Sequence, residues 1–147
     1  MNIRVVLCFM SSALLSFSAL AQPDIAVMRF DIDRGNERKS STMLSRLGES
    51  ATISETDKPE RGNGYEIAVM AMPTPESHDA LVLEIEFKDI LEGRKFTRFR
   101  SRVVVLTDKK LLIGEINDPV TGQLTSLSVT ATKQLSGDPV AEASSHR

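Results

Sequence analysis

Residues 81–106 decide the fold of this chain, and they read LVLEIEFKDILEGRKFTRFRSRVVVL. On each side of the segment from Asp89 to Gly93, apolar residues alternate with polar or charged ones. A period of two places successive side chains on opposite faces of a β-strand, whereas Asp and Gly favour turns. The stretch therefore predicts an antiparallel hairpin with strands over residues 81–88 and 95–106.

The register of this hairpin follows from matching both strand faces at once. When Phe87 is aligned with Phe99, apolar residues meet on the inner face and opposite charges meet on the outer face. A shift of one residue would move every side chain to the other face. The predicted pairs are Leu81–Val105, Leu83–Val103 and Phe87–Phe99 inside, and Glu84–Arg102 and Glu86–Arg100 outside.

The rest of the chain follows the same period of two. From Ala26 to Ile32 the even-numbered residues are apolar, and Leu127, Val129 and Ala131 share one face of a last strand. Further strands are expected over residues 40–45, 50–54, 65–72 and 111–116, although a short helix would fit at residues 40–47. About seven or eight strands predict an all-β fold, either a small antiparallel β-sandwich or a partly open barrel.

The first 21 residues have the pattern of a cleavable signal peptide. Arg4 precedes an apolar stretch from Val5 to Leu20, and the small residues Ala19 and Ala21 precede Gln22. A bilayer-spanning helix needs roughly 20 apolar residues, and serines interrupt this shorter stretch. We therefore expect cleavage between Ala21 and Gln22 and a soluble mature protein in the periplasm or outside the cell.

Length and composition predict one small domain. Removing residues 1–21 from the 147-residue chain would leave 126, and we expect a β domain over 22–135 with a disordered tail over 136–147. Cys8, the single cysteine, lies in the leader, so no disulfide is expected. Loss of Arg4 lowers Lys plus Arg from 18 to 17 against 20 Asp plus Glu, a net charge of −3 that argues against nucleic-acid binding.

Three segments resemble part of the C-terminal core domain of bacterial secretins, the outer-membrane gates of secretion systems and type IV pili. They are TMLSRLGESATI at residues 42–53, the strand pair within residues 65–86, and RVVVLTDKKLLIGEI at residues 102–116. Together they lie within residues 42–116, a little over half of the chain. The resemblance implies a small domain with related β topology. It does not imply a pore, because the periplasmic ring domains and the terminal segment of secretins are missing, and Glu115 replaces the second glycine of their Gly-Gly pair.

The densest charge cluster lies on the second strand of the hairpin and comprises Arg94, Lys95, Arg98, Arg100 and Arg102. Such a cluster can receive an anionic partner, such as lipopolysaccharide, phospholipid headgroups or an acidic protein face. Alternatively, it is a solvated strand face balanced by Glu84 and Glu86. The predicted register leaves Arg94 and Arg98 without partners and places Lys88 opposite Arg98. We therefore predict Arg94, Arg98 and Lys88 as partner-binding residues.

No residue pattern predicts a catalytic, cofactor or metal site. The oxygen-rich segment from Asp31 to Glu37 has its glycine and glutamate at the wrong spacing for an EF-hand loop, which favours a polar turn. His78 and His146 lack metal-ligand spacing, and no serine lies in a Gly-x-Ser-x-Gly elbow. Glu84 and Glu86 share a strand face, but arginines opposite them would lower their pKa values and prevent general-acid catalysis.

These patterns predict a non-catalytic binding or accessory protein of the bacterial envelope. The expected partner is another envelope protein, engaged through a sheet edge by strand addition. Two alternatives are compatible with the same patterns. One is a carrier of a small ligand or lipid, which requires a β-barrel cavity, and the other is a small hydrolase or lyase with scattered site residues.

Overall fold

The computed structural model describes residues 24–118 and 122–134. The predicted signal peptide, with Ala19, Ala21 and Gln22, and the predicted tail from residue 136 lie outside the described residues. Within them the chain forms strands and turns, and no helix is present that could cross a membrane. The strands are β1 (Ile25–Arg34), β2 (Glu37–Arg46), β3 (Ser50–Thr56), β4 (Gly64–Thr74), β5 (Ser77–Leu91), β6 (Arg94–Leu106), β7 (Lys110–Asn117) and β8 (Leu124–Gln134).

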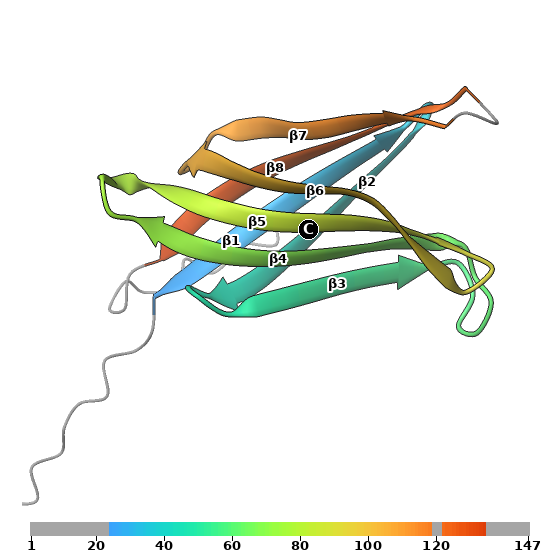
Figure 1. Cartoon of the computed structure of the whole chain (residues 1–147), viewed down its shortest axis with the longest axis horizontal. Coiled ribbons are helices and arrows are strands. Elements are labelled where there is room, and N and C mark those ends of the chain that lie inside the picture. The colour runs from blue at the N-terminus through green and yellow to red at the C-terminus, as the bar shows by residue number, and fades with distance from the viewer. Residues whose placement is uncertain (1–23, 119–121, 135–147) are drawn as a thin grey trace, which may run out of the picture.

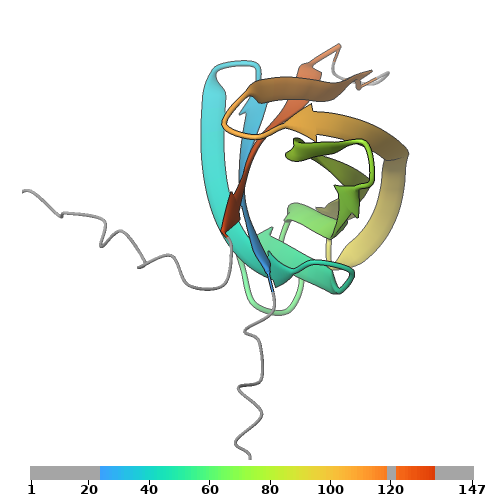
Figure 2. The same cartoon turned by 90° about the vertical axis from the view of Figure 1, so that its left-hand side faces the viewer.

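The eight strands form two antiparallel sheets of four, so the predicted all-β fold is confirmed. One sheet has the order β2-β1-β8-β7 and the other has the order β3-β4-β5-β6. The chain passes between the sheets twice, from β2 to β3 and from β6 to β7 (Figure 1). The sheets do not close into a barrel, and the fold is consistent with a small sandwich whose strands surround a common interior (Figure 2).

The core lies between the inward faces of the two sheets. The predicted even-numbered set from Ala26 to Ile32 is buried in β1, and Leu127, Val129 and Ala131 are buried beside it in β8. From the other sheet, Tyr65 and Phe87 contribute rings whose centroids lie 6.4 Å apart. The fully buried side chains of largest volume include Phe30, Phe87, Met28, Ile67, Leu81 and Leu83.

The predicted register of the β5–β6 hairpin is confirmed for all five pairs. Phe87 faces Phe99, and their rings stack with centroids 5.6 Å apart. The turn is tighter than predicted, because β5 continues to Leu91 and only Glu92 and Gly93 connect it to β6. Both residues have positive φ angles, 52° and 78°, and a two-residue turn of this hand matches the twist of the flanking strands.

Strand β2 covers all but the last of residues 40–47, the segment that would also fit a short helix. Its alternation directs Met43 and Ser45 towards the interior, where they are 7% and 6% exposed, respectively. The Ser45 hydroxyl group donates to the backbone carbonyl oxygen of Glu49 at 3.0 Å, which satisfies its polar atom. The inward serines therefore allow a rather polar segment to serve as a half-buried strand.

We expect the substitution Phe87→Ala to destabilise the protein by about 3–5 kcal/mol, because it leaves a cavity between two stacked aromatic rings. The control Phe96→Ala removes a phenyl ring that is 47% exposed on the neighbouring strand and should cost less than about 1 kcal/mol. Urea unfolding followed by circular dichroism measures both values. Equal losses from the two substitutions would contradict the described core.

Candidate binding surface on strand β6

Strand β6 carries five cationic residues and no carboxylate, and we call β6 the basic strand. They are Arg94, Lys95, Arg98, Arg100 and Arg102. Strand β5 lies on one side of β6 and supplies most of the neighbouring carboxylates. The burial of each ion pair between a β6 cation and a neighbouring carboxylate decides whether the cation remains exposed to solvent.

Two pairs on the outer face leave their guanidinium groups largely exposed. Arg100 lies 2.9 Å from Glu86, and Arg102 lies 3.6 Å from Glu84. The arginine side chains are nevertheless 77% and 69% exposed, respectively. The hydrogen bond from Arg100 lowers the pKa of Glu86, as the sequence predicted for this carboxyl group. Glu86 therefore stays ionised and is unsuited to act as a general acid near neutral pH.

The prediction that Lys88 faces Arg98 is wrong. A β-bulge between Phe87 and Lys88 shifts the register, so Lys88 pairs with Thr97 instead. The ammonium group of Lys88 lies 3.2 Å from Glu86 and 3.3 Å from Glu66. These two carboxylates, Glu86 first, raise the pKa of Lys88. The side chain is held in an ion-pair network around Glu66, which Lys95 of β6 also contacts.

Arg98 also has a partner, contrary to the predicted register. Its Nε atom lies 2.6 Å from the carboxylate of Asp89, and its side chain is only 26% exposed. Asp89 also pairs with Arg34 of β1, so this cluster joins the two sheets. Arg94 is exposed and has no ion pair within the described residues. Of the three predicted binding residues, Arg94 alone keeps the expected unpaired charge, and its role in binding stays a prediction.

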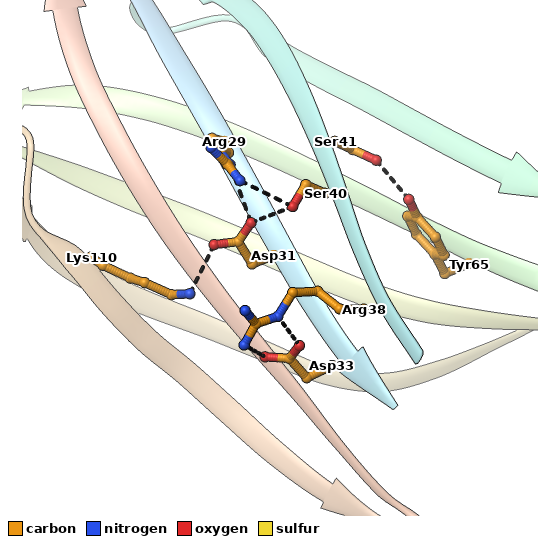
Figure 3. Close-up of polar contacts among 8 residues, drawn as sticks. All are labelled: Arg29, Asp31, Asp33, Arg38, Ser40, Ser41, Tyr65 and Lys110. Carbon is orange, nitrogen blue, oxygen red and sulfur yellow. Dashed lines mark hydrogen bonds and ion pairs between the residues drawn. The ribbon is translucent and has the colours of Figure 1, made fainter. Parts of the chain in front are cut away.

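A second charged group lies on the outer face of the other sheet, around Asp31 (Figure 3). Lys110 of β7 lies 2.8 Å from one carboxylate oxygen, and Arg29 lies 3.2 Å from the other. The Ser40 hydroxyl group donates to this second oxygen at 2.6 Å. The residue is only 8% exposed. The hydrogen bonds from Lys110 and then Ser40 lower the pKa of Asp31 from 3.8 to about 2.

The predicted polar turn between Asp31 and Glu37 is confirmed. Asp31 and Asp33 belong to β1, and Gly35 and Asn36 form the turn that leads into β2. Asp33 is engaged by Arg38 at 2.6 Å (Figure 3). The carboxylates of this segment therefore interact with cationic side chains and a hydroxyl group. Sequence reasoning missed the Asp31 cluster, because Lys110 is distant in sequence and no periodicity indicates that β7 and β1 share a sheet.

Polar side chains also bridge the two sheets beside the core. The Tyr65 hydroxyl group lies 2.7 Å from the Ser41 hydroxyl group and donates to Glu55 at 2.7 Å. Burial is the main cause that raises the pKa of Tyr65. Figure 3 shows the contact between Ser41 of β2 and Tyr65 of β4. The phenol group thus satisfies its polar atom while its ring packs against Phe87.

His78 is exposed near the start of β5, and His146 lies outside the described residues. No group of three or more metal-binding side chains occurs in the part of the chain that the structure describes.

No protein-family model matches the chain, and no curated protein has a sequence that matches it. The resemblance to the secretin core domain therefore stays a prediction based on the three segments within residues 42–116.

We expect Asp31→Asn to destabilise the protein by about 1–2 kcal/mol at pH 7, because it removes a carboxylate with a lowered folded-state pKa. The stabilisation is present above the ordinary pKa of 3.8 and is lost as the pH falls through about 2, where the carboxyl group is protonated in both states. Urea unfolding at a series of pH values measures the difference between the two proteins. This difference should shrink between pH 4 and pH 2.

The control is Asp79→Asn, which changes an exposed aspartate in β5 and should alter stability little. A difference between wild type and Asp31→Asn that is the same at pH 2 and pH 7 would contradict a stabilising role for the Asp31 carboxylate.

Proposed function

We propose that this protein is an exported, non-catalytic binding or accessory protein of the bacterial envelope, and that it binds a protein partner through strand β6. The observation that carries the proposal is the surface of β6. Arg100 and Arg102 are largely exposed there, and within the described residues β6 pairs with a neighbouring strand on one side only. Unpaired sheet edges are sites where another chain can add a strand.

Export is part of the same proposal and is supported by the leader sequence. The apolar stretch from Val5 to Leu20 and the small residues Ala19 and Ala21 have the order of a signal peptide. The envelope is then the compartment in which the exported domain would meet its partner.

The packing of the interior favours a binding surface over a carrier cavity. The space between the described sheets contains large side chains that are fully buried, including Phe30, Phe87 and Met28. A carrier needs an internal space that can hold a ligand of several hundred cubic ångströms. The partly open β6–β7 side also distinguishes this fold from a closed barrel.

The alternative of a small hydrolase has less support from the geometry. His78 is exposed near the start of a strand, and Glu84 and Glu86 are engaged by arginines. A general acid requires a carboxyl group with a raised pKa, whereas the pKa of Glu86 is lowered.

The proposal is tested by crosslinking the full-length, C-terminally tagged protein in its cells of origin and identifying captured envelope proteins by mass spectrometry. We expect one envelope protein to be captured, and we expect Arg100→Gln with Arg102→Gln to reduce its yield several-fold. The control pair, Arg46→Gln with Lys58→Gln, removes the same charge from exposed residues outside β6 and should leave the yield unchanged.

Capture of no envelope protein would contradict a binding function. Capture that is equally strong with both variant pairs would contradict the assignment of β6 as the binding surface.

A further inference from the structure

Resting on the proposed function, we propose that β6 binds an extended segment of its partner by strand addition. In this segment, two acidic residues separated by one residue lie opposite Arg100 and Arg102, and the residues around them are apolar. The backbone of β6 would provide affinity, and its side chains would select the sequence.

The edge of β6 opposite β5 is unpaired within the described residues. Strand β6 spans Arg94–Leu106 and pairs with β5, and within the described residues no strand pairs with its other side. Most of its residues are exposed, including Arg94 to Thr97. An edge strand of this kind presents a row of backbone N–H and C=O groups that a second chain can pair with.

Strand β7 turns away from β6. Thr107 to Lys109 connect the two strands, and the backbone of Lys109 donates to Leu106 at 3.1 Å within this turn. Beyond the turn, β7 pairs with β8 in the other sheet. Figure 1 shows β6 and β7 diverging from their shared turn. The edge of β6 away from the turn is therefore the accessible part.

The outer face of β6 is complementary in charge to an acidic segment. Arg100 and Arg102 each contact one glutamate of β5, yet both side chains are more than two-thirds exposed. A guanidinium group has five N–H donors, so each arginine keeps donors for a second carboxylate. Carboxylates on an added strand would lie directly beside these groups, because side chains opposite each other on neighbouring strands are in contact range.

The inner face of the same edge carries apolar side chains that are incompletely covered. Phe99 and Val103 point inwards and are only partly buried, and Leu111 and Ile113 of β7 are also partly buried against the core. An added strand would cover these side chains if its own residues at the matching positions were apolar.

The basic strand disfavours a second copy of this chain as the occupant. Two β6 strands paired with each other would bring arginines of both chains onto one sheet face, and like charges on neighbouring strands are destabilising. Cationic edges protect sheets from self-association in this way. An acidic segment of another protein removes this repulsion.

The experiment measures the binding of a dye-labelled decapeptide to the full-length protein by fluorescence anisotropy. In the peptide, valine alternates with polar residues, and two successive polar positions near the middle are glutamate. We expect saturable binding that weakens with added salt and is lost when both glutamates are replaced by lysine. Arg100→Gln with Arg102→Gln should weaken binding about tenfold, equivalent to about 1.4 kcal/mol. Arg46→Gln with Lys58→Gln should leave it unchanged.

Backbone pairing is tested with two N-methylated forms of the peptide. One carries methyl groups on the odd-numbered amides and the other carries them on the even-numbered amides. An added strand directs alternate amides towards β6, so one form should lose binding and the other should retain it. Equal binding of both forms would overturn strand addition.

The outcomes separate this inference from the proposed function. If an envelope protein is captured through Arg100 and Arg102 but the peptide does not bind, strand addition is overturned and the binding function stands. Binding to anionic phospholipid vesicles without binding to the peptide would overturn the inference and indicate a membrane surface as the ligand. Self-association of the wild-type protein through β6, detected by analytical ultracentrifugation, would also overturn it.

Discussion

The pairing of β1 with β8 is the constraint on which the rest of the structure depends. All other ladders join strands that are consecutive in the chain, whereas this one joins the first strand to the last, from Ile25 opposite Gln134 to Arg34 opposite Thr125. Without this pairing, the β7–β8 hairpin would not be joined to β1 and β2, and the buried side chains of β1 would lose their contacts with β8. Closing such a long loop carries an entropic cost, which the core residues of both strands must offset.

Side chains compensate where the backbone ladder is interrupted. Between β2 and β3, which belong to different sheets, Lys39 lies 3.4 Å from Glu55. Nearby, the Ser41–Tyr65 contact joins β2 to β4. At the end of β1, the Asp89 carboxylate interacts with Arg34 and Arg98 and thereby connects three strands. These polar bridges stabilise the relative position of two sheets that share no continuous hydrogen-bond ladder.

The sequence was sufficient to predict features that depend on local alternation. The β5–β6 register could be derived because two independent patterns, apolar pairs such as Phe87–Phe99 and charge pairs such as Glu86–Arg100, required the same alignment. The bulge after Phe87 could not be derived, because it inserts a residue without disturbing either pattern. The bulge gives Lys88 and Arg98 other partners than predicted. These are two of the three residues for which the sequence predicted a role in binding. The Asp31 cluster could not be predicted for another reason. The alternation of apolar and polar residues does not reveal which strands are neighbours in a sheet.

Burial divides the basic strand into residues with different physical roles. Arg98 is mostly buried against Asp89, and removing one partner of such a pair leaves an uncompensated charge. Arg100 and Arg102 belong to exposed pairs, which typically contribute about 0–1 kcal/mol to stability. Their charges therefore matter less for holding β6 in its sheet than for deciding what can approach its edge. A strand that is anchored by its buried residues can present exposed arginines to a partner with little effect on the fold.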